Sequence, residues 1–288
     1  MASFVEQLSH FVESEEINLL LVTGIPRSIS TALCRSLSSA PNIDSLYINE
    51  LFNRIIDSPE EASAVIMDTA RTHFTRDIKS KRVMIIKNMA SYLSLSAYLA
   101  FEDIASYRLW VIRDPLIQMG SLVTRIANDM QKPGSDELEP QEVYQYLESV
   151  STLLENSEKS RRYSKTGWLA IAELFDSQDD DNFCVVDGEK FVDRPQETLQ
   201  AICFVSGIPY GDIMVTNWSN SFNFVNVVNI GNETETRTNA WTQKAATATG
   251  IAQTRRTPLD IDRVPERMRE HIIEVAIPIY NRLSEITV

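Results

Sequence analysis

The segment GIPRSIST, residues 24–31, gathers hydroxyl groups and one guanidinium directly after an apolar run at 17–23. Its hydroxyls belong to Ser28, Ser30 and Thr31. Arg27 adds a planar cation that can bind a phosphate or sulfonate through two parallel hydrogen bonds. The apolar run predicts a buried strand, and the spacing Ala32, Leu33, Leu37 predicts a helix after the segment. A loop between a strand and a helix presents backbone N–H groups and the helix dipole to an anion, so the segment predicts an anion-binding loop.

The Walker A loop, GxxxxGK[ST], is another loop of this kind that binds nucleotide phosphates. A match would require glycine at position 29 and lysine at position 30, where this chain has Ile29 and Ser30. The missing lysine disfavours a P-loop kinase or nucleotide hydrolase, which stays as an alternative. Taken alone, the loop could also be an ordinary polar turn with a capping serine.

A second segment, VIRDPLIQMGSL, places Arg113 at the end of another apolar run and Ser121 eight positions later. Asp114 and Pro115 predict the N-cap and first residue of a helix that continues to about residue 128. On that helix Ser121 lies two turns along, so Arg113 and Ser121 can reach the same crevice. Taken singly, Arg113 could pair with Asp114, and Ser121 could be a packing residue. Together the two residues place a guanidinium and a hydroxyl at one crevice.

The remaining chain supplies the elements that position these segments. Apolar runs at 82–86, 107–112 and 182–187 predict further buried strands. Helices are predicted at about 91–104, 195–206 (closed by Gly207) and 265–283. The alternation predicts an α/β fold, with a parallel sheet flanked by helices in three layers and ligands beyond the carboxyl ends of its strands. We expect one domain over 1–288, with a helical insertion at about 130–175 and an Asn/Thr-rich excursion at about 216–257.

The first segment resembles the 5′-phosphosulfate loop of sulfotransferases that use PAPS (3′-phosphoadenosine-5′-phosphosulfate), commonly PRSGST in bacterial members. The second resembles the family's 3′-phosphate site, where a strand-ending arginine precedes a serine by eight positions. The resemblance implies a P-loop-like sulfotransferase architecture that binds PAPS with Arg27, Ser28, Ile29, Ser30, Thr31, Arg113 and Ser121. Ile29 replaces the usual glycine, which leaves open whether the loop keeps the family's backbone.

Shorter likenesses extend this comparison. IIKNMASYL resembles the KDMA-type segment of bacterial members, and this implies that Lys87 acts with Arg27 on the transferring group. WTQKAATATGI resembles a late Trp-to-Gly segment, after which Arg255 and Arg256 would cover the 3′-phosphate. A solvated basic turn is the alternative for that pair.

An acceptor hydroxyl or amine needs a base. Glu50, in SLYINELFN, resembles the glutamate that follows the first loop and its helix in several bacterial members, and an ordinary surface carboxylate is the alternative. The three histidines, His10, His73 and His271, fall away from predicted strand ends. Asp187, at the end of a strand, is the second candidate base after Glu50, and the alternative for it is a carboxylate that bonds neighbouring backbone groups.

Composition limits the possible partners. The net charge of −13 disfavours nonspecific binding to nucleic acid or an anionic membrane. No apolar run approaches the roughly 20 residues of a membrane span. Three widely spaced cysteines without a CxxC pair argue against a disulfide framework or a metal site, and favour a reducing, cytoplasmic location.

The expectation is therefore a metal-independent sulfotransferase that uses PAPS and releases adenosine 3′,5′-bisphosphate (PAP). Its acceptor is expected to be a small neutral or cationic metabolite. The acidic balance and motif types are similar to cyanobacterial sulfotransferases of saxitoxin-type guanidinium alkaloid pathways. A catalytically inactive nucleotide-binding member of the fold is the second alternative. The sequence does not indicate an oligomeric state.

Overall fold

The computed structural model describes residues 2–49, 59–74, 80–92, 95–130, 166–216, 218, 224–226, 248–251 and 258–288. Their strands are β1 (Asn18–Gly24), β2 (Ile43–Asn49), β3 (Lys81–Met89), β4 (Tyr107–Ile112), β5 (Phe183–Asp187) and β6 (Phe224–Asn226). They form one sheet in the order β5-β4-β1-β3-β2-β6, and every neighbouring pair is parallel. The predicted α/β class with a parallel sheet is confirmed.

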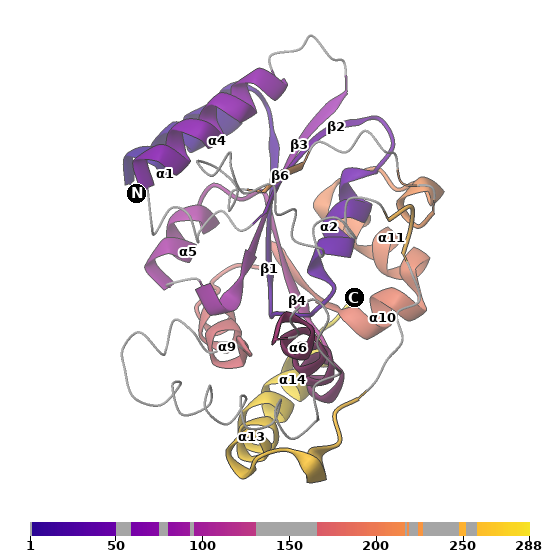
Figure 1. Ribbon diagram of the computed structural model, residues 1–288. Helices are drawn as coiled ribbons and strands as arrows, with labels where there is room; N and C mark the ends of the chain where they lie inside the picture. Colours follow the sequence, from indigo (N-terminus) through magenta and orange to yellow (C-terminus); the bar gives the residue numbers. More distant parts are fainter. Residues whose placement is uncertain are drawn as a thin grey trace.

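Helices cover both faces of this sheet (Figure 1). One face carries α1 (Ala2–Ser14), α4 (Pro59–Phe74), α5 (Leu95–Glu102) and α9 (Trp168–Asp176). The other carries α2 (Ser30–Ser38), α10 (Gly188–Asp193) and α11 (Pro195–Ser206). At one end of the sheet lie α6 (Pro115–Met130), α13 (Glu266–Glu270), the π-helical η5 (His271–Ala276) and α14 (Ile277–Ser284). Single 3-10 turns are η1 (Ala90–Tyr92), η2 (Asp212–Met214) and η4 (Ile261–Arg263).

Strand residues alternate between two cores. In β1, Leu19 and Leu21 join the cluster under α1 and α9, whereas Leu20 and Val22 join the cluster under α2 and α11. Successive side chains of a strand point to opposite faces, so a strand covered on both sides is apolar throughout. This explains why β1 appears in the sequence as a continuous apolar run.

The strand order places a topological switch beside β1. From β1 the chain continues to β2 and β3 on one side of it, and then crosses to β4 and β5 on the other. Directly after β1, the N–H of Ile25 donates to the carbonyl of Val111, near the end of β4, at 3.2 Å. Loops leaving the carboxyl ends of β1 and β4 therefore begin next to each other, which is where open α/β sheets bind ligands.

Several elements differ from the sequence prediction, and α1 and β6 had no predicted counterpart. β2 was not predicted, because its first three residues are only half buried and include the polar Asp44 and Ser45. The helix expected at 91–104 is shorter, with η1 preceding α5. The helix expected at 265–283 contains η5, and Pro278 accounts for it: proline has no N–H, and its ring crowds the preceding turn, which the wider π turn relieves.

Much of the two predicted insertions lies outside the described residues, namely 131–165 of the helical one and most of 216–257. From the second, β6 adds an edge strand beside β2. None of the described helices is long and apolar enough to cross a membrane.

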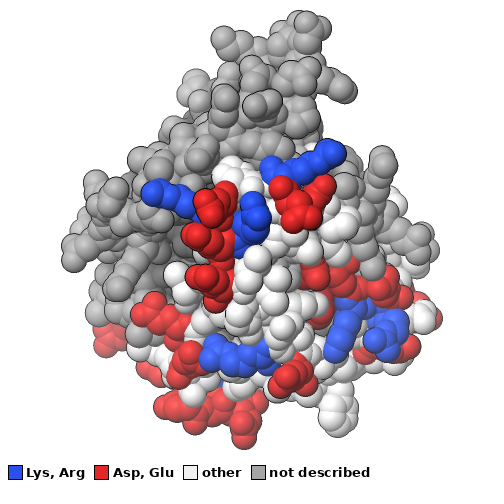
Figure 2. All heavy atoms as spheres, turned by 90° about the horizontal axis from the view of Figure 1, so that it is seen from below, with Lys and Arg blue, Asp and Glu red and all other residues white. Residues whose placement is uncertain are grey.

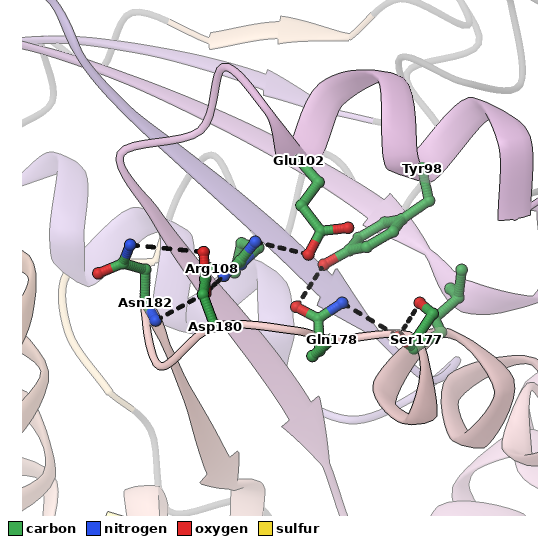
Figure 3. A network of polar contacts seen from close by, with 8 residues as sticks. Tyr98, Glu102, Arg108, Ser177, Gln178, Asp180 and Asn182 are labelled. Atoms are coloured by element: carbon green, nitrogen blue, oxygen red, sulfur yellow. Dashed lines mark hydrogen bonds and ion pairs between the residues drawn. The ribbon is translucent and has the colours of Figure 1, made fainter.

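A network of charged groups lies at the end of the sheet where the strands begin, opposite to the end with the carboxyl termini of β1 and β4 (Figure 3). Arg108, the second residue of β4, donates from Nη1 to Glu102 Oε1 at 2.6 Å and from Nη2 to Asp180 Oδ1. Its side chain is 3% exposed, and that of Glu102 is 8% exposed. Beside it, the hydroxyl of Tyr98 donates to Gln178. The network joins α5, β4 and the turn before β5, and its charged members Glu102, Arg108 and Asp180 line a cavity of about 560 Å³.

Candidate functional site

The loop after β1 has a strained backbone. Arg27 has a φ of 67° and Ile29 a φ of 71°, both in the left-handed region that glycine adopts without steric penalty. Ile29 therefore keeps a glycine-like backbone at the position where the bacterial motif has glycine. Gly24 allows the loop to fold back, because a Cβ there would lie 2.8 Å from Ser28 Oγ. Such strain costs about 1–3 kcal/mol per residue and persists only where neighbours hold the chain.

Neighbouring elements hold the loop through its carbonyl groups. Gln118 of α6, fully buried, donates from Nε2 to the carbonyl of Pro26 at 2.9 Å. Arg113 donates from Nη1 to the carbonyl of Arg27 at 3.2 Å. Gly188 lies against the next carbonyl, because a Cβ there would be 2.7 Å from Ser28 O. Contacts from α6, from the turn between β4 and α6, and from the start of α10 thus fix the loop in its strained form.

The two predicted anion segments meet in the structure. Arg27 Nε donates to Ser121 Oγ at 3.0 Å, across 94 positions of sequence. Arg113 does not pair with Asp114, whose Oδ1 caps α6 by accepting from the backbone N–H of Leu116 at 2.9 Å. Arg113 pairs instead with Glu189, the second residue of α10, at 2.5 Å between Nε and Oε1. Arg27, Arg113 and Ser121 therefore share one site at the carboxyl ends of β1 and β4.

Buried hydroxyl groups at this site have unused hydrogen-bonding capacity. Ser28 is fully buried and Thr31 is 8% exposed, yet neither side-chain oxygen has a hydrogen-bond partner within the described chain. The first turn of α2, which begins at Ser30, also leaves backbone N–H groups without an intrahelical acceptor. Buried polar groups are normally bonded, so these donors fit an anionic group such as a phosphosulfate.

Lys87 lies deeper in the sheet than its predicted place at the strand end. It pairs in register with Val22, two residues before β1 ends at Gly24. Its side chain is fully buried and donates to Asn49 Oδ1 at 3.0 Å, an oxygen that also accepts from Tyr47. The structure thus places Lys87 one strand away from the loop, on the face covered by α2.

Three predicted site residues, Glu50, Arg255 and Arg256, lie outside the described residues. The histidines lie in other surroundings: His10 is exposed on α1, His73 is 2.9 Å from Asp44, and His271 is 2.9 Å from Thr166.

Cysteine chemistry has no place at this site. Burial raises the pKa of Cys34 and Cys184 to about 12 and that of Cys203 to about 11, so all three thiols are protonated at neutral pH. Among the described residues, no group of three or more His, Cys, Asp or Glu side chains could hold a metal ion.

Sequence reasoning missed Gln118, Gly188 and Glu189. Gln118 lies in the second motif, but nothing in its spacing shows that it turns toward Pro26. Gly188 and Glu189 follow Asp187 at the end of β5, and a polar residue after a parallel strand is a usable signal for a site. Asp187 bonds a backbone group, as its alternative interpretation predicted, accepting from the N–H of Glu189 at 2.8 Å.

Comparison with known proteins places sulfotransferases among the similar structures. A sulfotransferase from Alicyclobacillus acidocaldarius has a TM-score of 0.48 at 16% identity, over 67% of this chain and 81% of the other. The sulfotransferase domain of the Synechococcus PCC 7002 olefin synthase has a TM-score of 0.45 at 15% identity, over 71% and 78%. The sulfotransferase domain of the curacin biosynthetic pathway has a TM-score of 0.41 at 14% identity, over 69% and 77%. No family model and no curated protein sequence matches the chain.

Proposed function

We propose that this chain is a sulfotransferase that binds PAPS at the carboxyl ends of β1 and β4 and transfers its sulfuryl group to a small acceptor. The observation that carries the proposal is the bond from Arg27 to Ser121. It unites the loop that resembles a 5′-phosphosulfate site with the strand and helix that resemble a 3′-phosphate site. A nucleotide with anionic groups at both its 5′ and 3′ positions suits two adjacent anion sites.

In this proposal the residues of the chain bind and orient the donor. Arg27, the hydroxyls of Ser28, Ser30 and Thr31, and the first turn of α2 hold the 5′ end, and Arg113 with Ser121 holds the 3′-phosphate. Sulfuryl transfer forms a bond from the acceptor to sulfur while the bond from sulfur to the 5′-phosphate oxygen breaks. Positioned cations stabilise the charge that develops, a role we propose for Arg27 and Lys87. Arg255 and Arg256 are proposed to cover the 3′-phosphate.

The acceptor is proposed to be a small neutral or cationic molecule. Figure 2, which looks onto the end where α6, α13 and α14 lie, shows acidic side chains in several groups with basic ones between them. The described part of this face thus has no broad basic field for a polyanionic acceptor. The sequence likeness to alkaloid sulfotransferases makes guanidinium compounds the first cations to screen.

Calorimetry with PAP and with ATP plus Mg²⁺ tests the donor. We expect PAP to bind at least about tenfold more tightly, because ATP lacks the 3′-phosphate that Arg113 and Ser121 would hold. A clear preference for ATP would instead support a kinase or nucleotide hydrolase. PAP binding without sulfate transfer from PAPS in an acceptor screen would indicate an inactive member of the fold.

We propose that Glu50 accepts the acceptor's proton. Replacing Glu50 with Gln is expected to lower the turnover number about 100-fold, because general-base catalysis contributes on that order, and to leave PAP affinity within about twofold. Glu197→Gln provides a comparison at an exposed carboxylate of α11, away from the donor site. Unchanged turnover in Glu50→Gln would remove Glu50 as the base.

A further inference from the structure

Glu189 fixes the orientation of Arg113. Arg113 Nε donates to Glu189 Oε1 at 2.5 Å, and Nη1 donates to the carbonyl of Arg27 at 3.2 Å. The two side chains are 6% and 13% exposed, so water screens this ion pair only weakly. Two of the three guanidinium nitrogens are thus held, and Nη2 has no protein hydrogen-bond partner within the described chain.

The position of Glu189 is itself determined from two sides. Its backbone N–H donates to Asp187 Oδ1 at 2.8 Å, and the hydroxyl of Tyr280, from α14, donates to Asp187 Oδ2 at 2.8 Å. Burial, with the nearby Asp187, raises the pKa of Tyr280, so its hydroxyl stays a donor. Gly188 lets this turn lie directly against the carbonyl of Ser28. A continuous set of contacts therefore runs from α14 through Glu189 and Arg113 to the loop after β1.

A carboxylate here can act on a bound phosphate in two opposite ways. It can orient Arg113 and strengthen binding, or it can compete for the guanidinium and weaken binding. The geometry favours orientation, because Glu189 bonds Nε and leaves Nη2 available. An arginine held in its binding geometry also loses less side-chain entropy when a phosphate binds.

We propose that Glu189 is a positioning residue that sets the discrimination between nucleotides with and without a 3′-phosphate. The inference rests on the proposed function, since it assigns Arg113 to the donor's 3′-phosphate. Glu189 touches neither the donor nor the acceptor in this assignment. It acts through Arg113 alone.

The test is calorimetry of PAP and of adenosine 5′-phosphate with wild type, Glu189→Ala and Glu189→Gln. The readout is the dissociation constant of adenosine 5′-phosphate divided by that of PAP, a ratio that a general loss of stability would not change selectively. We expect Glu189→Ala to lower this ratio about tenfold, almost entirely through weaker PAP binding. Gln can still accept from Arg113 Nε, so Glu189→Gln is expected to keep the ratio within about threefold of wild type. Glu197→Ala is the matched control: it removes the same charge from a neighbouring helix, where the side chain is 70% exposed.

The possible outcomes distinguish a failure of the proposed role of Glu189 from a failure of the proposed PAPS site. A wild-type protein that binds both nucleotides equally would contradict the 3′-phosphate site itself. A wild type that discriminates, with an unchanged ratio in Glu189→Ala, would overturn only the role of Glu189. Tighter PAP binding in both variants would show competition and would also overturn the inference. Thermal unfolding of each variant, with and without saturating PAP, establishes that the folded protein is being compared.

Discussion

Replacing Arg113 with alanine is expected to weaken PAP binding about 100-fold, while adenosine 5′-phosphate binding weakens no more than about threefold. Truncating one partner of a buried, hydrogen-bonded charge pair commonly costs 2–5 kcal/mol, and 100-fold corresponds to about 2.7 kcal/mol. The 3′-phosphate would lose a guanidinium that Glu189 and the carbonyl of Arg27 hold in place. Parallel titrations of the two nucleotides measure the difference.

The alanine variant also leaves Glu189 buried without a cation, which lowers stability. The double variant Arg113→Ala/Glu189→Gln removes that charge and is the control for a folding defect. It should regain thermal stability without regaining PAP affinity. Equal weakening of both nucleotides in the double variant would show that Arg113 does not contact the 3′-phosphate.

Replacing Arg108 with alanine is expected to lower the free energy of unfolding by about 3–5 kcal/mol without changing nucleotide discrimination. The variant leaves Glu102 buried at the start of the sheet with no cation beside it (Figure 3). Burial already raises the pKa of Glu102, and Arg108 opposes that rise, so removing Arg108 should raise the pKa further. Urea unfolding with the linear extrapolation method measures the loss.

Two comparisons make this prediction specific. Arg282→Ala removes a pair with Asp176 in which both side chains are about half exposed, and it should cost no more than about 1 kcal/mol. Adding Glu102→Gln to Arg108→Ala removes the unpaired buried carboxylate and should recover part of the lost free energy of unfolding. A loss below about 1 kcal/mol for Arg108→Ala would mean that water reaches Glu102 once the guanidinium is gone.

Sequence patterns predicted the elements that are apolar on both faces. The strands β1, β3, β4 and β5 appear as continuous apolar runs because helices cover both sides of the sheet. β2 escaped because Asp44 and Ser45 near its start break the run, and in the fold Asp44 lies 2.9 Å from His73 of α4. The contact that allows a carboxylate in this strand therefore comes from a helix distant in the sequence, and no local pattern predicts it.

The site was predicted in its parts but not in its connections. Arg27, Arg113 and Ser121 each follow from a local motif at a strand end. Their mutual contacts depend on β4 lying directly beside β1, and the sequence does not give the strand order. The pairing of Arg113 with Glu189 further requires β5 beside β4. A charge partner 76 positions away has no local signature.

The left-handed backbone of Ile29 has a consequence for how such loops diverge. A β-branched residue in this conformation costs about 1–2 kcal/mol, whereas glycine costs about 0.5–1 kcal/mol in chain entropy on folding. Ile29 also packs its side chain against the core under α2, which offsets part of its strain. Isoleucine and glycine at this position then differ little in folding free energy. A substitution of one by the other during evolution therefore needs few stabilising changes at other positions. A search pattern that demands glycine at this position would overlook chains whose loop has the same shape.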